Sequence, residues 1–337
     1  MAEQNSLVTD DDQLLRWRMH SQFADRPATV AEIAARAPGI QAQDAGAARL
    51  GLRARGLAEP AAVQRAYLDS EVVSSWLMRG TLHLLPTDQL QPLLALFGAR
   101  NIAAGARRRR ELGLTEEVLG RALAVLPEVL TEPLSRAELV ARLNHRGVGV
   151  EPTGQAPAHL MAYAAGLGLL CRGAELTPRE PGYRLVPAGA EADPEQAAAE
   201  LAARYVAAFG PAGPADFAAW SGLTQAVGRR AFAGLPEVGD GLFAVGEPPG
   251  EGEPLVRLLG GFDNYLLGYR DRGLMLDQRY AKRINAGGGL VRPALVVDGR
   301  VLGSWRRDGG RVVVEPFEAV PEELWAAEAA AVESFWG

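Results

Sequence analysis

Residues 39–56, GIQAQDAGAARLGLRARG, contain two glutamines one residue apart at a position where a helix begins. The stretch predicts a helix start with Gln41, Gln43 and Asp44 in its first turn. In a regular helix the two glutamine side chains would point about 200° apart and could not share a target. They converge only if the segment is extended or if the helix starts around them, and Gly39 permits such an irregular entry. A glutamine cap beside a surface glutamine is the simpler alternative.

The stretch belongs to a pattern that occurs three times along the chain. Each copy has a short helix-like segment with a capping or small residue at its start, then a second short helical segment, then strand-like segments. The first helices are predicted over residues 28–36, 134–143 and 214–223, and the second, recognition-type helices over residues 41–55, 154–169 and 224–233. Helix, turn, helix and hairpin is the winged-helix pattern. The sequence therefore predicts an α+β fold with three tandem winged-helix units, and three generic helical hairpins are the alternative.

The strand-like segments follow each helix pair and continue into a β-rich C-terminal portion. Residues 77–84 alternate, which predicts one strand face carrying Arg79, Thr81 and His83. Two strands are predicted within residues 169–187, and two more strands within residues 239–269, around a Pro/Gly loop. Beyond residue 290, the pairs Asp298-Gly299 and Asp308-Gly309 predict turns between strands, and a closing helix is predicted from Pro321.

Three domains follow from the repeat. They are predicted over residues 1–100, 101–193 and 194–337, the last including the β-rich portion. Their boundaries are expected near residues 99–113, where RRRRELG occurs, and near residues 188–195, which are rich in Ala, Gly, Pro and Glu.

Length and composition limit the class of protein. A chain of 337 residues with 48% hydrophobic residues can form two or three folded domains. No apolar run reaches the roughly 18 to 20 residues that span a bilayer, and the acidic N-terminus lacks a signal-peptide layout, so we expect a cytoplasmic protein. Cys171 is the only cysteine, which excludes a disulfide framework. The net charge of -6 argues mildly against indiscriminate nucleic-acid binding.

Several chemistries lack their motifs. The sequence has no Walker-type phosphate loop and no GxGxxG that opens a βαβ unit. Its four histidines have no ligand-like spacing, so no metal and no cofactor is expected; they are His20, His83, His145 and His159. Gly287 to Gly289 are interpreted as a loop. Lys282, the only lysine, lies in a predicted loop and does not justify a Schiff-base mechanism.

Arginine supplies almost all the positive charge, and its planar fork suits phosphates. The candidate DNA-binding arginines lie in the recognition-type helices or in the run between the first two units. They are Arg49, Arg53, Arg55, Arg107, Arg108, Arg109, Arg110, Arg229 and Arg230. Solvated surface charge is the alternative for each. Arg79, Thr81 and His83 are further candidates for contact with DNA, with an ordinary sheet face as the alternative.

The segments GIQAQDA, SSWLMRGTLHLLP, GGFDNYLLGYRDR and RPALVVDGRVLGSWRR, in this order, resemble the AlkZ/YcaQ family of winged-helix DNA glycosylases over roughly residues 14–317. The resemblance implies a C-shaped arrangement of three winged helices around double-stranded DNA. It implies release of bulky N7-alkylated purines, and of interstrand crosslinks, made by natural genotoxins, often as self-resistance in an antibiotic producer. The catalytic motif it implies is Gln-x-Gln, matched by Gln41 and Gln43. Asp44 lies one place beyond the YcaQ-branch aspartate and does not inherit its role.

Two glutamines are chemically sufficient for such a substrate. N7 alkylation makes the base cationic, so it departs neutral and needs no general acid. A glutamine carbonyl can orient a water and stabilise an oxocarbenium-like sugar as a fixed dipole. We therefore expect a monomeric, monofunctional hydrolase. The alternatives are a non-catalytic winged-helix transcription regulator and a protein-binding scaffold. The segment with Asp263, Tyr265, Tyr269, Arg270 and Arg272 has no derived role, except that Asp263 and Arg272 could form an internal ion pair.

Overall fold

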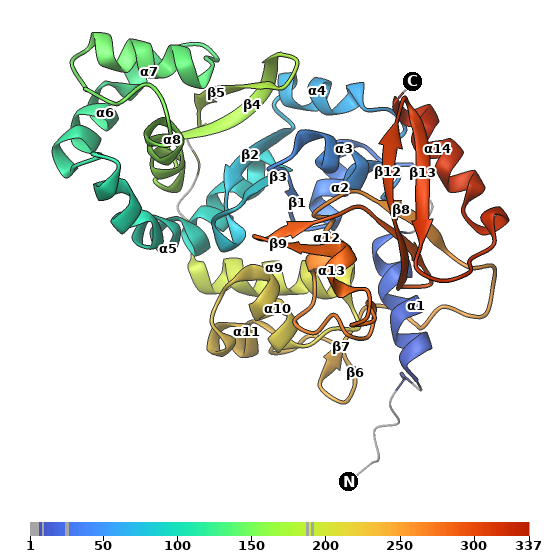
Figure 1. The fold of residues 1–337 in the computed structure, drawn as a ribbon. Helices are drawn as coiled ribbons and strands as arrows, with labels where there is room; N and C mark the ends of the chain where they lie inside the picture. Colours follow the sequence, from blue (N-terminus) through green and yellow to red (C-terminus); the bar gives the residue numbers. More distant parts are fainter. Residues whose placement is uncertain (1–6, 9, 24–26, 187–188, 190–191, 337) are drawn as a thin grey trace. The chain divides into compact units, whose positions relative to one another are not determined.

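The computed structural model describes residues 7–8, 10–23, 27–186, 189 and 192–336. The chain forms two compact units, one of residues 1–62 and 198–337 and one of residues 63–197 (Figure 1). These limits differ from the predicted ones, and the division into three winged-helix domains stays a prediction. In the described part of the chain, no helix is long and apolar enough to span a bilayer.

The first unit is mostly helical in its N-terminal and central parts. Its helices are α1 (Asp11–Gln22), α2 (Val30–Arg36), α3 (Ala45–Arg53), most of α9 (Pro194–Phe209), α10 (Pro214–Ser221), α11 (Gln225–Ala231), α12 (Asn264–Leu267), α13 (Ala281–Ile284) and α14 (Ala326–Trp336), with a 3₁₀ turn η3 (Glu322–Leu324). The pairs α2/α3 and α10/α11 confirm two of the three predicted helix pairs. Thr29 and Glu32 form a capping box at the start of α2, and Thr224 caps α11.

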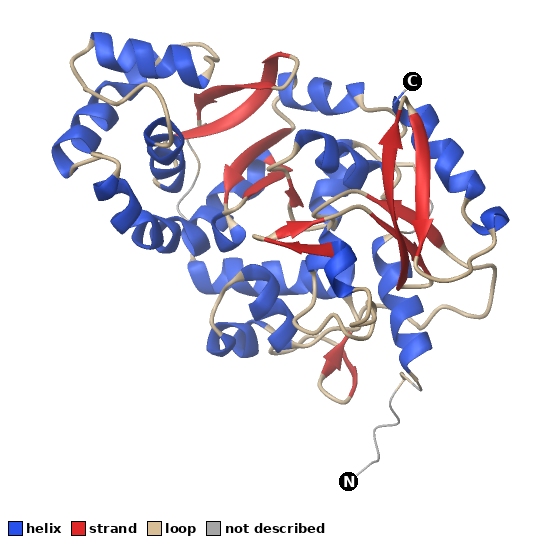
Figure 2. Cartoon of the chain, in the orientation of Figure 1, coloured by secondary structure: helices blue, strands red, loops and turns tan. Residues whose placement is uncertain are grey.

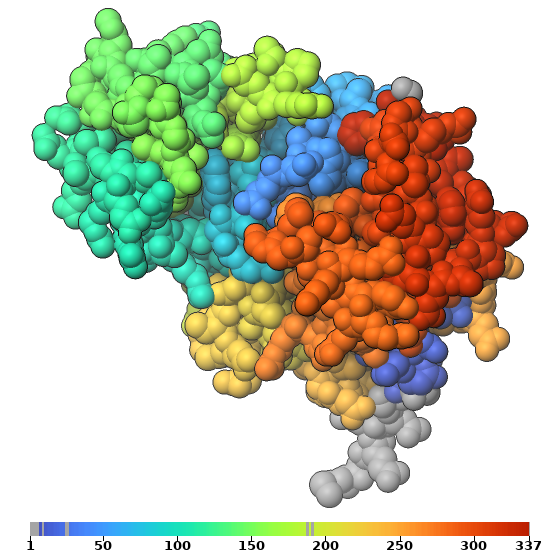
Figure 3. Space-filling view, viewed as in Figure 1, coloured from blue at the N-terminus to red at the C-terminus, as the bar shows by residue number. Residues whose placement is uncertain are grey.

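The strands of the first unit are short in the middle of the chain and longer near its end (Figure 2). They are β1 (Ile40–Gln41), β6 (Glu237–Gly239), β7 (Leu242–Phe243), β8 (Val256–Leu259), β9 (Asn285–Gly287), β10 (Leu290–Val291), β11 (Ala294–Val297), β12 (Arg300–Asp308) and β13 (Arg311–Pro316). A four-stranded antiparallel sheet has the order β13-β12-β11-β8. Buried Leu258, Leu295 and Trp305 of this sheet pack with Val332 of α14 and Leu50 of α3. Figure 3 shows the C-terminal part, in red, as one continuous surface.

The second unit contains the other helix pair and one sheet. Its helices are most of α4 (Ala61–Leu68), α5 (Leu90–Glu111), α6 (Glu116–Val129), α7 (Arg136–His145) and α8 (Ala156–Gly166), with 3₁₀ turns η1 (Met78–Gly80) and η2 (Thr87–Gln89). Its strands are β2 (Val72–Trp76), β3 (Leu82–Pro86), β4 (Leu170–Thr177) and β5 (Glu180–Leu185), side by side in the order β3-β2-β4-β5. The pair α7/α8 and the hairpin β4–β5 confirm the second predicted helix pair and its two strands.

Leucines from α6, α7 and α8 form the core of the second unit. Leu126, Leu139 and Leu160 are almost completely buried and belong to one cluster with Tyr183 of β5. This packing explains why the period of apolar residues predicted α7 and α8; α6 was not predicted.

Three predictions about local structure were wrong. Residues 77–84 are not one strand, because Arg79 (φ 54) and Gly80 (φ 70) turn the chain between β2 and β3. The segment after β8 forms α12 instead of continuing as a strand. Lys282 lies in α13 and not in a loop. The expected boundary at residues 99–113 overlaps the C-terminal half of helix α5, and it stays a prediction.

The C-terminal turns follow the predicted pattern with one shift. Asp298 and Gly299 have φ values of 44° and 88° and connect β11 to β12, as their sequence predicts. In the next hairpin Asp308 still pairs with Arg311, so the turn residues are Gly309 and Gly310. Gly288 and Gly289 form the turn of the β9–β10 hairpin. Part of the predicted linker at residues 188–195 lies outside the described residues.

Candidate active site

Gln41 and Gln43 both precede α3. Gly39 has a φ of 85° and Gln41 ends the short extended segment β1, while Asp44 is the N-cap of the helix and accepts a hydrogen bond from Ala47 N–H at 2.7 Å. Residues two apart in an extended chain lie on the same side. The two side chains accordingly meet, and Gln41 Nε2 donates to Gln43 Oε1 at 3.1 Å. The condition stated for convergence, an extended segment before the helix, is met, and Asp44 rather than a glutamine serves as the helix cap.

The two glutamines differ in their exposure. Gln41 is 6% exposed, whereas the Gln43 side chain faces solvent. Gln41 Oε1 is fully buried and has no hydrogen-bond partner among the described residues. Buried carbonyl oxygens are nearly always paired, so an unpaired one in a polar segment marks a position where a ligand or water can bind. The pair therefore offers one buried acceptor and one solvent-accessible amide.

Asn264 contacts the backbone on both sides of Ile40. Its Nδ2 donates to Gly39 O at 2.8 Å, and its Oδ1 accepts from Gln41 N–H at 3.4 Å. Asn264 is only 4% exposed. The Gln-x-Gln segment is thus held by a residue of α12.

Asp263 pairs with Arg55 and not with Arg272, which corrects the ion pair considered above. The two Asp263 oxygens accept from Arg55 Nη1 and Nη2 at 2.9 Å each, and both side chains are almost fully buried. Arg272 instead donates to Asn285 Oδ1 at 3.3 Å. Arg55 is consequently a structural residue and is not available to bind phosphate.

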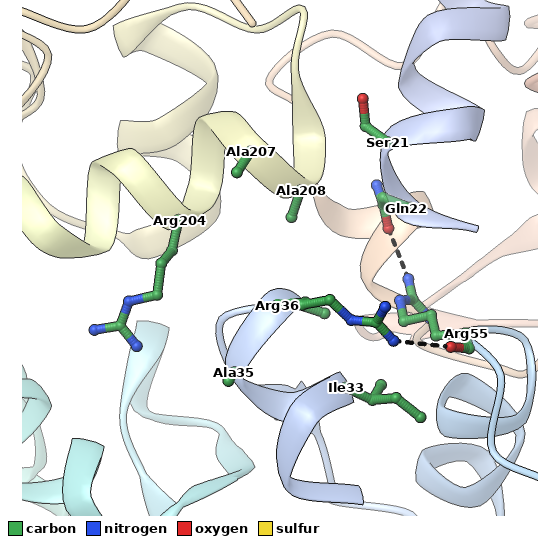
Figure 4. A pocket seen from close by; sticks show the side chains of 10 residues that line it. Ser21, Gln22, Ile33, Ala35, Arg36, Arg55, Arg204, Ala207 and Ala208 are labelled. Carbon is green, nitrogen blue, oxygen red and sulfur yellow. Dashed lines mark hydrogen bonds between the residues drawn. The ribbon is translucent and has the colours of Figure 1, made fainter. Parts of the chain in front are cut away.

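Arg55 has further partners that fix its position. It donates to Gly51 O and to Gln22 Oε1, and its guanidinium lies 4.7 Å from the centroid of the Phe23 ring. Figure 4 shows the bonds that join Gln22 to Arg55 and Arg36 to the Arg55 carbonyl, beside a cavity of about 370 Å³. The C-terminal end of α3 is therefore fastened to α1 and to Asp263.

The predicted face of Arg79, Thr81 and His83 does not exist. Arg79 is exposed in the turn before β3, and Thr81 Oγ1 donates to Met78 O. His83 is 3% exposed, its Nδ1 lies 2.9 Å from Thr81 O, and burial lowers the pKa of His83 from 6.5 to about 4. His83 is thus a buried neutral side chain. Arg79 stays a predicted DNA contact.

The arginine run at the end of α5 is divided between surface and interior. Arg107 and Arg108 are exposed and pair with Glu111, and these two bonds lower the pKa of the Glu111 carboxyl. Arg109 is 7% exposed, donates to Ile102 O and lies 4.6 Å from the Tyr163 ring centroid. Arg109 is therefore packed within its unit. Arg110 is exposed.

The remaining predicted basic residues belong to the first unit. Arg229 and Arg230 are exposed on α11. Arg53 is mostly buried in a bidentate pair with Glu328 at 2.7 and 2.9 Å, so its predicted contact with phosphate is not available in this arrangement. Arg49 is partly exposed on α3, and Lys282 is exposed on α13. No group of three His, Cys, Asp or Glu side chains in the described ranges is arranged to hold a metal.

Reasoning from the sequence missed Asn264 and the Asp263–Arg55 pair. The one available signal was the segment GGFDN, whose glycines lie where a side chain would not fit. A Cβ on Gly260 would come 3.0 Å from the Cβ of Leu50 on α3. Such close approach indicates that this segment is pressed against the helix that follows the two glutamines.

Comparisons with known proteins identify the class of enzyme. The sequence model of the family described as "DNA glycosylase AlkZ-like" matches residues 34–336. The chain belongs to this family and is a DNA glycosylase, with DNA as its substrate. It is 31% identical to the "Interstrand DNA cross-link repair glycosylase" of Streptomyces sahachiroi, over 95% of each protein. The solved structure of the Streptomyces sahachiroi DNA glycosylase AlkZ matches with a TM-score of 0.81 and 29% identity, covering 97% of this chain and 96% of that one.

Proposed function

We propose that this glycosylase releases bulky N7-alkylated purines from double-stranded DNA by simple hydrolysis at Gln41 and Gln43. The observation that supports this assignment is the hydrogen-bonded glutamine pair, which contains one buried, unpaired oxygen. The pair carries no charge and cannot protonate a leaving group. It suits a base that is already cationic and leaves neutral, and it would leave unmodified guanine intact.

The two side chains have different tasks in this proposal. Gln43 is solvent-exposed and holds the hydrolytic water through Oε1, which keeps one lone pair after accepting from Gln41. Gln41 holds the Gln43 carbonyl in place through its Nε2, and its own buried carbonyl contributes a fixed dipole as positive charge develops at C1′. Water adds to C1′, the C1′–N9 bond breaks with its electron pair going to N9, and one proton of the water is released.

The reaction proceeds without a covalent intermediate. A lyase needs an amine for a Schiff base, and the only lysine, Lys282, lies on α13, whereas the glutamines precede α3. Borohydride should accordingly trap no enzyme–DNA adduct during base release.

Binding to DNA is proposed to rest on arginine–phosphate contacts. The exposed candidates are Arg79, Arg107, Arg108, Arg110, Arg229 and Arg230. Such contacts position the protein on the duplex without reading sequence. We propose that the enzyme acts as a monomer on chromosomal DNA in the cytoplasm.

The name of the Streptomyces relative supports interstrand DNA crosslinks as further substrates. The proposal includes unhooking of interstrand crosslinks made by a genotoxic natural product, and self-resistance of the producing cell as the biological role.

Measuring base release tests the proposal. The purified protein is incubated with duplexes that contain one N7-methylguanine, one bulky N7-alkylguanine, or no modification. We expect release of both alkylated bases, with the bulky adduct preferred, and no release from unmodified DNA. Tight binding to all three duplexes without release of any base would instead indicate a non-catalytic DNA-binding protein.

A further inference from the structure

The side chain of Asn264 bridges the two backbone groups that set the direction of the Gln-x-Gln segment. Its amide both donates to Gly39 O and accepts from Gln41 N–H, so one planar group fixes the chain before and after Ile40. Only a side chain with a donor and an acceptor at this separation can make both bonds. Gly39 has a positive φ, and glycine restricts the backbone direction little by itself. The two bonds from Asn264 therefore define the direction of the backbone after Gly39.

Asn264 is itself held rigidly. Phe262, the residue before Asp263, has a φ of 59°, a conformation that bulky side chains rarely adopt. Asp263 then caps α12 by accepting from Tyr265 N–H at 2.8 Å, while its two oxygens bind Arg55. Because Arg55 also donates to Gly51 O in α3, the asparagine is fastened to the same helix that follows the glutamines.

We infer that Asn264 is a positioning residue for the hydrolysis reaction. By fixing the Gln41 backbone, it directs Gln41 Nε2 to Gln43 Oε1 and holds Gln41 Oε1 in its buried, unpaired position. The Asp263–Arg55 pair acts behind it as the anchor. This inference rests on the proposed catalytic role of the two glutamines.

The first test is the substitution Asn264→Ala, which removes both bonds to the segment. Misplacement of a reacting group by about 1 Å can slow a reaction about a hundredfold. We therefore expect single-turnover release of an N7-alkylguanine to slow by about tenfold to a hundredfold. The Kd for the damaged duplex should stay within about a factor of three, because phosphate contacts supply most of the affinity.

Asn144 offers a matched control in the other unit. Its Nδ2 donates to Val150 O at 2.7 Å and its Oδ1 accepts from Val150 N–H at 2.8 Å, so it holds a loop through the same pair of bonds. Asn144→Ala should lower the melting temperature and leave the release rate per folded molecule unchanged. Equal slowing in both variants would overturn the inference, because general loss of rigidity would then explain both.

A double-substitution cycle separates positioning from a merely structural role. If Asn264 acts through Gln41, then Asn264→Ala should slow release little further in a protein that already carries Gln41→Ala. Multiplying effects, with tenfold or greater slowing in both backgrounds, would contradict the inference.

Asn264→Asp provides a second test of the positioning role if the alanine variant does not fold. The carboxylate can accept from Gln41 N–H but repels the Gly39 carbonyl, whereas the protonated acid can make both bonds, and burial favours the protonated form. The rate of this variant relative to wild type should therefore rise as the pH is lowered from 8 to 6. A pH-independent ratio near one would overturn the inference. If the wild-type protein releases no base, the proposed function fails instead, and the two failures are distinguishable.

Discussion

The loops that lead into α3 and α8 are both clamped by an asparagine, but the two asparagines come from very different places. Before α8, Asn144 binds Val150, six residues further along the chain. Before α3, Asn264 binds Gly39 and Gln41 across 225 and 223 residues. The helices α2 and α7, which precede these loops, both begin with a capping box, at Thr29 and at Ser135.

The loop before α8 is held by an asparagine from the adjacent helix α7. The loop before α3 is held by more interactions than this, and they come from residues distant in the sequence. Its clamp depends on a buried ion pair and a residue with positive φ, and an unpaired buried amide oxygen remains at Gln41. Each of these features is destabilising unless something compensates for it. Their concentration at one segment supports the proposed catalytic role of Gln41 and Gln43.

The largest expected effect on stability is that of Asp263→Ala, which leaves Arg55 buried without its partner. Breaking a buried ion pair in this way should lower the free energy of unfolding by about 3 to 5 kcal/mol. Chemical denaturation measures the loss. Glu117→Ala removes the exposed pair with Arg121 and should cost about 0 to 1 kcal/mol. Equal losses in the two variants would show that the buried pair of Asp263 stabilises the protein no more than the exposed pair of Glu117.

Acid should destabilise the second unit through His83. Its pKa is lowered by burial to about 4, against 6.5 in the unfolded chain, so the unfolded state binds more protons between these pH values. Stability is fully present above pH 6.5, is lost as the pH falls towards 4, and the loss amounts to roughly 3 kcal/mol. The free energy of unfolding of wild type and His83→Gln is measured by denaturation at pH 7.5 and pH 4.5. The decrease between the two pH values should be smaller in His83→Gln. The same pH dependence in both proteins would show that His83 does not cause it.

The local clamp can be broken without touching the glutamines. Asn144→Ala removes two hydrogen bonds, and we expect a loss of about 1 to 3 kcal/mol in the free energy of unfolding. Calorimetry or denaturant unfolding gives this value. An unchanged stability would show that the loop before α8 needs no clamp.

The smallest effect is expected at Arg107. Its pair with Glu111 is exposed to solvent and contributes little to stability. Arg107→Ala should therefore leave stability nearly unchanged, while the slope of log K against log salt for DNA binding falls in magnitude by about 1. Arg121→Ala, which removes an exposed arginine outside the predicted DNA contacts, should leave the slope as it is. The same slope for Arg107→Ala would exclude Arg107 as a phosphate contact.

Local signals in the sequence predicted the three helix pairs, but not the longer helices α5, α6 and α9. The capping residues Thr29 and Ser135 and the period of the apolar residues predicted α2 and α7, because both act within a few residues. Alternation failed at residues 77–84, because it cannot detect that Arg79 and Gly80 reverse the chain in left-handed conformations.

Long-range contacts explain what the sequence could not reveal about the site. The convergence of Gln41 and Gln43 could be predicted as a condition on local geometry, since they are two residues apart. Asp263 and Arg55 are 208 residues apart, and nothing in either neighbourhood identifies the partner. Arg55 and Arg109 were assigned to the surface because burial of an arginine depends on tertiary partners, here Asp263 and the Ile102 carbonyl.

Single-turnover release of an N7-alkylguanine by Gln41→Ala and Gln43→Ala measures whether the two glutamines are catalytic. Removing one fixed dipole from a comparable site costs about 3 to 4 kcal/mol, which is a hundredfold to a thousandfold in rate. We predict slowing of that size in each variant, with the melting temperature and the affinity for damaged DNA nearly unchanged. Wild-type rates in both variants, together with a loss of about 1 kcal/mol in stability from the lost hydrogen bond, would show that the two glutamines have only a structural role.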